Sequence, residues 1–166
     1  MTAHPDVLSA LNVAHSAEAT AAEQFHLQEH EFKRGERRIP KLAKWFDKRQ
    51  REAADRQHDV RNTIMSHGGT VKPKFGDLSY SSEPGEALEK ACKTLDGLAA
   101  AHQSIHEAIH DRLKSSDEDE DKTYYRGIQE KHLGFAADLH DKYQKGQQKQ
   151  QQLKDLGPAL FIAKHS

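Results

Sequence analysis

The segment GGTVKPKFGDLSYSSEPGE, residues 68–86, is the one long irregular stretch in a sequence that otherwise keeps helical periodicity. Elsewhere proline and glycine fall only at intervals, where they start or end apolar-periodic segments. The predicted helices span residues 5–34, 40–67, 84–114 and 118–145. At 1.5 Å per residue each would be about 45 Å long, a length that suits a four-helix bundle.

The length of the connection between the second and third helices decides the topology. About 15 residues, at about 3.3 Å per extended residue, can run the whole length of a bundle. The other two connections are short and predict antiparallel hairpins. The sequence therefore predicts an all-α, ferritin-like four-helix bundle, in which a long crossover joins two hairpins and the second and third helices run in the same direction. We expect the crossover to lie outside the bundle, pinned by its apolar residues, which are Val71, Phe75, Leu78 and Tyr80.

The two ends of the fourth helix carry distinct signals. SSDEDEDK, residues 115–122, predicts an N-cap followed by an acidic first turn that favours the helix dipole. Gly146 predicts the helix end, so that residues 1–146 form the bundle and residues 147–166 a Gln-rich connector with an apolar tail. Within this tail, LGPALFIAK is expected to be ordered only when docked, on its own bundle or on a neighbouring subunit. The residues that would drive docking are Leu156, Leu160, Phe161 and Ile162.

Composition narrows the class of protein. The formal net charge of -1 gives no basic footprint for nucleic acid or an anionic membrane. The single cysteine, Cys92, fits a reducing compartment and a small packed side chain. No apolar run reaches the roughly 18 residues of a membrane span, and the N-terminus lacks signal-peptide architecture. We therefore expect a cytoplasmic protein with neither nucleic-acid nor membrane partners. Its 12 histidines are the compositional feature to explain.

Three histidines recur at four-residue intervals in HQSIHEAIH, residues 102–110. Stepping residues by about 100° places His102 at the centre of the apolar stripe of its helix, with His106 near it and His110 towards the edge. The histidines that we expect on the surface are His4, His26, His30, His67, His110, His140 and His165.

Polar residues also interrupt the apolar stripes of the first and fourth helices. Glu18 lies at the centre of the first stripe with Glu29 beside it, and His132 lies at the centre of the fourth. In the crossover topology Glu18, His102 and His132 meet at one level. Each would carry a large desolvation cost if it were left unpaired, so we expect them to satisfy one another or a ligand.

Two interpretations of the buried polar residues at this level remain open. In the first, a metal ion satisfies the buried groups. Its candidate ligands are Glu18, Glu52, His102 and His132, with Glu29, His106 and Gln129 as alternates. In the second, the groups form a metal-free polar network, in which Glu18 pairs with Arg49 or Arg56. The helical phase turns both arginines inward and places Glu52 on a flank.

Two segments resemble bacterioferritins, members of the ferritin-like superfamily. AEATAAEQFHLQEHEFKRG, residues 17–35, is similar to the first helix of that family, and TIMSHGGTVKP, residues 63–73, to the end of its second helix. Glu18 matches the family's single ligand on the first helix, and Gln24 and Phe25 match its polar–aromatic pair. Over residues 8–145, the resemblance implies a di-iron site, iron oxidation and storage, and subunits that assemble into a shell.

The ligand pattern of that family is degraded here. Such sites take one Glu from each of two helices and Glu-x-x-His from each of the other two. The second helix instead offers Glu52 and Asp55, and the phase makes Asp55 a poor inward group. The third helix offers His102 in place of Glu, and the fourth offers Gln129 with His132. A nitrogen-rich mononuclear site or an altered two-metal site fits these residues better, because imidazole suits Zn, Cu, Fe and Ni.

The sequence therefore favours a ferritin-like metal-binding homo-oligomer, with iron oxidation or storage through an altered ligand set, and with zinc or another transition metal as alternatives to iron. No catalytic residue is assigned. The alternative is a non-catalytic helical bundle for assembly or partner binding. A haem-binding bundle is a weaker third interpretation, because the chain lacks a haem-attachment motif.

Overall fold

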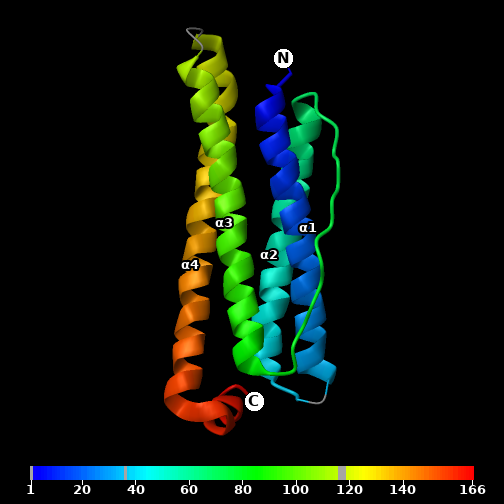
Figure 1. Ribbon diagram of the computed structural model, residues 1–166, viewed down its shortest axis with the longest axis vertical. Coiled ribbons are helices and arrows are strands. Elements are labelled where there is room, and N and C mark those ends of the chain that lie inside the picture. Colours follow the sequence, from blue (N-terminus) through cyan, green and yellow to red (C-terminus); the bar gives the residue numbers. More distant parts are fainter. Residues whose placement is uncertain (1, 36, 116–118) are drawn as a thin grey trace.

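The computed structural model describes residues 2–35, 37–115 and 119–166. Its helices are α1 (Pro5–Arg34), α2 (Pro40–Ser66), α3 (Pro84–Lys114) and α4 (Asp119–Lys164). They lie side by side as a four-helix bundle (Figure 1), and no strand occurs in the described ranges. The all-α prediction is confirmed.

The chain path follows the predicted hairpin–crossover–hairpin order. The crossover leaves the end of α2 and runs outside the bundle beside α1 to the opposite end, where α3 begins (Figure 1). As a result α2 and α3 run in the same direction, as predicted. None of the described helices is long and apolar enough to cross a membrane.

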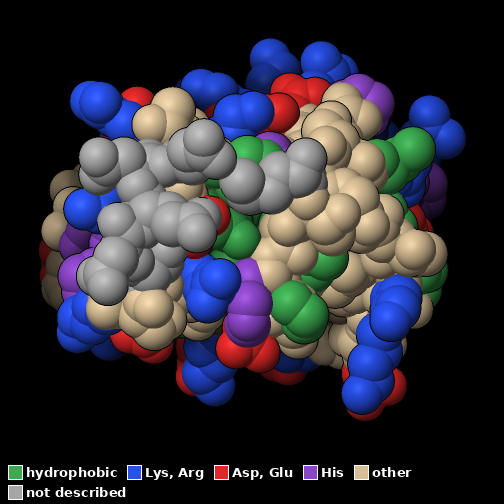
Figure 2. All heavy atoms as spheres, turned by 90° about the horizontal axis from the view of Figure 1, so that it is seen from above, with side chains coloured by type: hydrophobic (Ala, Val, Ile, Leu, Met, Phe, Trp, Pro, Cys, Tyr) green, Lys and Arg blue, Asp and Glu red, His purple; other side chains and the backbone are tan. Residues whose placement is uncertain are grey.

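Proline sets the start of three helices. Pro5, Pro40 and Pro84 each occupy a first-turn position, where the missing N–H is no loss and the fixed φ favours the helix. The acidic cap predicted for α4 falls partly on residues 116–118, which lie outside the described residues. Seen from that end of the bundle, Lys and Arg side chains spread around the perimeter (Figure 2), as expected for the solvated rim of an amphipathic bundle.

The apolar core is divided into two clusters. One contains Phe25, Phe46 and Leu88, and the other contains Leu11, Val60 and Ile105. Along every helix the break between the clusters coincides with a buried polar residue, and these residues are Glu18, Arg56, His102 and His132. A polar layer therefore separates the two halves of the core.

A ladder of hydrogen bonds ties the crossover to α1. Polar side chains at four-residue intervals on one face of α1 accept from backbone N–H groups of the extended chain. The bonds are Lys72 N–H to Asn12 Oδ1 (2.7 Å), Lys74 N–H to Ser16 Oγ (2.9 Å), Gly76 N–H to Thr20 Oγ1 (3.0 Å), Ser79 N–H to Gln24 Oε1 (2.7 Å) and Ser81 N–H to Gln28 Oε1 (3.0 Å). The Gln28 amide also donates to the Ser81 carbonyl at 2.7 Å. The helix thus supplies the partners that a lone extended segment lacks.

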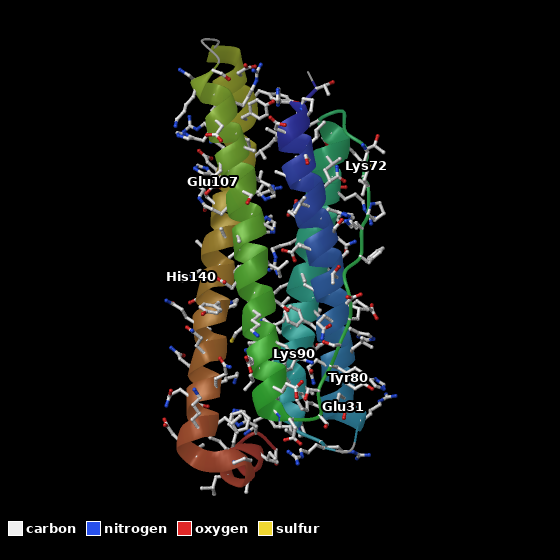
Figure 3. The ribbon with its side chains drawn as sticks, viewed as in Figure 1. Glu31, Lys72, Tyr80, Lys90, Glu107 and His140 are labelled. Carbon is white, nitrogen blue, oxygen red and sulfur yellow. The ribbon has the colours of Figure 1, made fainter. Side chains whose placement is uncertain are left out.

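This ladder corrects the prediction that apolar side chains pin the crossover. Of the four residues, only Val71 packs against the core. The side chains of Phe75, Leu78 and Tyr80 are 69%, 44% and 56% exposed. Tyr80 and Lys72 mark the outer course of the segment in Figure 3. Backbone hydrogen bonds hold the crossover, so its side chains are left free to face solvent.

Gly146 does not end the fourth helix, contrary to the prediction. α4 continues to a bend at Gly157, whose φ of 77° is in the left-handed region that favours glycine. At Gly146 a Cβ atom would lie 2.9 Å from Cys92 Sγ and 3.8 Å from the Trp45 ring. Glycine is therefore required there by close helix packing, and Cys92 is the buried, packed side chain that we expected.

We expect Gly146→Ala to lower the free energy of unfolding by about 1–3 kcal/mol, because the added methyl group must displace Cys92. Gly127→Ala is the matched control: it lies on the same helix, where an added Cβ meets nothing within 4 Å. It should raise stability by up to about 1 kcal/mol through helix propensity. Urea unfolding of both variants measures the difference, and equal effects would contradict the close-packing explanation.

The apolar tail docks on its own bundle. After the Gly157 bend, Phe161 is fully buried in the core and Ile162 packs beside it. The His165 carbonyl accepts from the Lys41 N–H at 2.9 Å, at the start of α2, where no side chain caps the helix. Docking is as predicted, with two corrections: Leu160 is 62% exposed, and His165 is buried rather than on the surface.

Candidate functional site

The polar layer brings together three of the predicted site residues. Glu18, His102 and His132 are each fully buried, and they come from α1, α3 and α4. His102 Nε2 lies 2.8 Å from Glu18 Oε1, and His102 Nδ1 lies 2.8 Å from His132 Nδ1. The two imidazole rings are stacked, with centroids 5.0 Å apart. The predicted meeting of these residues at one level is therefore present in the structure.

Arg56 completes this cluster from α2. Its Nε donates to the same Glu18 oxygen at 2.6 Å, and the residue is only 5% exposed. The result is a buried chain, Arg56–Glu18–His102–His132, with one residue from each helix. Glu18 thus has a fixed cationic partner within the fold.

Hydrogen-bond chemistry assigns the protons along this chain. A carboxylate only accepts, so His102 must donate from Nε2 to Glu18. When the His102 ring carries this one proton, its Nδ1 accepts from the Nδ1–H of His132, and His132 Nε2 is then the unprotonated nitrogen. Both ring nitrogens of His102 are engaged within the protein.

The surroundings of His132 keep its ring uncharged. Burial and then the neighbouring His102 lower the pKa of His132 to about 3. The Phe135 ring meets both imidazoles edge-on, at centroid distances of 5.3 Å from His102 and 5.5 Å from His132. The imidazole of His132 is therefore neutral at physiological pH.

Some buried polar atoms have no hydrogen-bond partner in the part of the chain that the structure describes. Within the cluster these are Glu18 Oε2 and His132 Nε2. Outside it they include His106 Nδ1 and both ring nitrogens of His15. His15 is 1% exposed, and burial, together with the charge of Arg61, lowers its pKa. Sequence reasoning missed His15, although it lies one turn after Leu11 and one turn before Ala19, both of which are buried.

Glu52, the fourth candidate ligand, does not join the cluster. It pairs with Arg49, whose Nε lies 3.0 Å from Glu52 Oε2 and whose guanidinium carbon lies 5.2 Å from the centre of the Trp45 ring. Burial is the main factor that lowers the pKa of Arg49, and Glu52 partly opposes it. The inward phase predicted for both arginines is correct, but they have different carboxylate partners.

The alternate ligands also lie apart from Glu18. Glu29 pairs with Lys33 at 3.4 Å along α1. His106 stacks with His110, with ring centroids 6.3 Å apart. Gln129 is half-buried on α4 and forms no hydrogen bond with the cluster in the part of the chain that the structure describes. The buried cluster is thus limited to Glu18, His102, His132 and Arg56.

These residues do not fit a dinuclear iron site. Such a site needs several inward carboxylates to balance and bridge two cations, whereas this layer has one, and Arg56 already neutralises it. His102, the central imidazole, uses both nitrogens in hydrogen bonds. Among the described residues, no three His, Cys, Asp or Glu side chains are arranged to hold a metal ion.

His132 should make stability depend on pH. Its pKa is about 3 in the folded chain and about 6.5 in an unfolded one. Above about pH 6.5 both states are neutral. Between about 6.5 and 3 only the unfolded state takes up the proton, so stability should fall by up to about 1.4 kcal/mol per pH unit. We expect His132→Asn to reduce this slope by one proton, as measured by urea unfolding across that range.

The control for this titration is His140→Gln. His140 lies exposed on the outer face of α4 (Figure 3), where solvent hydrates the ring in both states. This variant controls for the loss of an exposed histidine from the same helix. A slope in His132→Asn equal to that of the unmodified protein would contradict the assignment of a neutral buried ring.

Comparisons with solved structures identify the fold. Bacterioferritin from Rhodobacter capsulatus, in a structure with a metal-free dinuclear site and haem iron, has a TM-score of 0.84 and 16% identity over 100% of this chain and 96% of that chain. A mycobacterial bacterioferritin has a TM-score of 0.83 and 20% identity over 99% and 95%. BfrA, a bacterioferritin of Mycobacterium tuberculosis, has a TM-score of 0.82 and 18% identity over 99% and 96%. No protein-family model and no curated protein matches the sequence.

The chain therefore has the ferritin-like fold over its whole length, with bacterioferritins among its structural neighbours. The resemblance seen in the sequence is confirmed at the level of fold.

Proposed function

We propose that this chain is a self-associating structural subunit of ferritin-like fold, and that its core site is a metal-free ion-pair network rather than a centre for iron oxidation. The observation that carries this proposal is the buried contact of 2.6 Å between Arg56 Nε and Glu18 Oε1. It occurs on the residue that the family resemblance assigns to iron.

The charges in the polar layer support a metal-free network. Two unit charges 4 Å apart interact by about 4 kcal/mol at an effective dielectric constant of about 20, and a divalent ion beside a guanidinium would meet about twice that repulsion. The ion would also have to displace a charge-assisted hydrogen bond on Glu18, which is among the stronger kinds. A metal at this level therefore competes with a cation that the fold itself supplies.

The proposed self-association uses the outer side of the crossover. Phe75, Leu78 and Tyr80 are exposed there, and Phe75 and Leu78 line a hollow of about 490 Å³ with residues of α1 and α2, among them Ala19 and Gln57. Clustered exposed apolar side chains mark interaction surfaces in soluble proteins. We propose a second copy of this chain as the occupant of this face.

Light scattering coupled to size-exclusion chromatography tests the self-association. We expect the unmodified chain to elute as an oligomer and the double variant Phe75→Ser, Leu78→Ser to shift towards the monomer. Leu160→Ser is the control, because Leu160 is 62% exposed but lies on the tail. A monomeric unmodified chain would contradict the self-association.

The second candidate function is the binding of a single transition-metal ion, iron or zinc, in the core. The two unpartnered atoms, Glu18 Oε2 and His132 Nε2, favour it, because a carboxylate oxygen and an unprotonated imidazole nitrogen are both suitable donors. His102 would be the third ligand if it gave up one of its hydrogen bonds. Glu52 would have to leave Arg49 to become the fourth.

Thermal melts with and without Fe²⁺ or Zn²⁺ distinguish the metal-free network from the metal site. Only a ligand that binds the folded state preferentially raises the Tm of the protein. For the metal-free network we expect no rise in the Tm of the unmodified protein. A rise that disappears in His102→Ala would establish the metal site in place of the network.

A further inference from the structure

A groove of about 740 Å³ lies between the crossover, α1 and α3, on the side of the crossover that faces away from the hollow at Phe75. We infer that this groove binds a small amphipathic anion, whose apolar chain lies along the floor and whose carboxylate head group lies beside Lys72 and Lys74. The volume is in the range of about 300–1,000 Å³ that is usual for small-molecule sites. The groove shares no lining residue with the buried polar layer or with the hollow proposed for self-association.

The extended crossover presents different side chains to its two sides. Lys72 and Lys74 line the groove, whereas Phe75 lines the hollow on the α2 side. This separation arises because successive side chains of an extended chain point in opposite directions. The backbone hydrogen bonds to Asn12 and Ser16 fix the orientation. The crossover therefore directs its cationic side chains to the groove.

The floor of the groove is apolar. It is formed by Ala17 and Ala21 of α1 and by Gly97 and Leu98 of α3, and Ala21 and Leu98 belong to the buried core. The polar side chains that α1 contributes to the wall already accept from the backbone of the crossover; they are Asn12, Ser16, Thr20 and Gln24. A ligand therefore meets apolar surface on the floor and ammonium groups at the rim, where the lysine stems extend the apolar surface.

The positive charge is unevenly compensated along the groove. On α3, Lys90 and Lys93 each pair with a glutamate of their own helix, at 3.2 Å and 3.5 Å, and Asp77 also lines the groove. Lys72 and Lys74 have no carboxylate partner among the residues that the structure describes. Lys72 and Lys90 lie towards opposite ends of the bundle (Figure 3). The uncompensated charge is therefore at the Lys72 end, and this end attracts the anionic head group.

Spacing along α1 indicates the length of the apolar chain. The Lys72 N–H bonds to Asn12, and the floor residue Ala21 follows nine residues later on the same helix. At 1.5 Å per residue this separation is about 13 Å, close to the extended length of decanoate. Decanoate is therefore the probe that matches both the charge and the length of the groove.

Isothermal titration calorimetry of the full-length chain with decanoate tests the inference. Butyrate has the same head group with a short chain, and decyltrimethylammonium has the same chain with a cationic head group. We expect one decanoate per chain, bound at least about tenfold more tightly than either comparison ligand, because each buried CH₂ group contributes to affinity and the lysines repel a cation.

Gly97→Leu tests the position of the apolar chain. An added Cβ at Gly97 meets nothing within 4 Å, so leucine can extend into the groove without displacing the core. It should weaken decanoate binding at least about tenfold, because it occupies the apolar floor. Gly134→Leu is the matched control: Gly134 has the same free space on α4, but it lies outside the groove. Its affinity should equal that of the unmodified chain.

The double variant Lys72→Gln, Lys74→Gln tests the position of the head group. It should weaken decanoate binding at least about fivefold, because it removes the uncompensated charge. Lys44→Gln, Lys48→Gln is the control: it removes the same charge from two exposed positions on α2, outside the groove. The control should bind decanoate as the unmodified chain does.

Three results would overturn the inference. They are the absence of saturable decanoate binding by the unmodified chain, equal affinities of Gly97→Leu and Gly134→Leu, and a loss of binding in Phe75→Ser, Leu78→Ser that Gly97→Leu does not share. The last result would place the ligand in the hollow. If circular dichroism shows that Gly97→Leu is unfolded, equal affinities of the two lysine double variants overturn the inference instead. None of these results affects the metal-free network, which involves no residue of the groove.

Discussion

Glu18→Ala is expected to lower the free energy of unfolding by about 3–5 kcal/mol, because it leaves the Arg56 guanidinium buried without its counter-charge. Arg56 is only 5% exposed, so water cannot replace the lost carboxylate without local opening of the bundle. His102 would lose its acceptor in the same change. Urea unfolding followed by circular dichroism measures the effect.

Two further variants isolate the ion pair from the loss of side-chain volume. Glu52→Ala removes the partner of Arg49, a side chain that is 24% exposed, and should lower the free energy of unfolding clearly less than Glu18→Ala does. The double variant Glu18→Ala, Arg56→Leu should recover much of the loss, because apolar replacement of a buried pair is often close to neutral. If the double variant were as unstable as the sum of its single changes, the charge argument would be wrong.

Phe161→Ala is expected to destabilise the chain by about 3–5 kcal/mol, the range for truncation of a buried aromatic side chain. Phe161 is fully buried in the core cluster that contains Phe46 and Leu88, and its ring stacks on His165 with centroids 4.1 Å apart. Its loss would also weaken the contact through which the tail covers the start of α2.

The neighbouring residue supplies the control for this prediction. Leu160 is 62% exposed, so Leu160→Ala should change stability by no more than about 0.5 kcal/mol. The two variants differ by one position and remove side chains of the same apolar class. Similar small effects for both would show that the tail contributes nothing to the stability of the bundle.

The bundle could be predicted from the sequence because burial follows helical periodicity closely. α1 and α3 have the predicted bounds, and Glu18, His102 and His132 are buried in mid-stripe as expected. The length of the crossover determined the topology, and the apolar stripes interrupted at one level located the polar layer. Hydrophobic phase records which side of a helix faces inward, so it locates buried polar groups as well as apolar ones.

The helical phase of a residue does not determine with which residue its buried side chain pairs. Arg49 and Arg56 share one phase, yet Arg56 crosses to Glu18 and Arg49 turns back to Glu52. That choice depends on side-chain reach within the assembled bundle. Gly146 was misjudged for a similar reason: the close approach of Cys92 is a tertiary contact, and a glycine required for packing looks in sequence like a helix end.

The apolar pattern also could not predict how the crossover is attached to the bundle. Asn12, Ser16, Thr20, Gln24 and Gln28 recur every four residues, but a polar face on α1 is equally typical of a helix surface facing water. Only the path of the extended segment gives these side chains their backbone partners. The same path leaves Phe75, Leu78 and Tyr80 on the outside.

Anaerobic equilibrium dialysis of the unmodified, untagged chain against Fe²⁺ tests the metal-free core most directly, with His102→Ala run in parallel to account for ions held by surface histidines. The Arg56–Glu18–His102–His132 network predicts the same iron content in both proteins, with no stoichiometric ion retained in the core. One or two additional Fe²⁺ ions per chain in the unmodified protein, absent from His102→Ala, would contradict it.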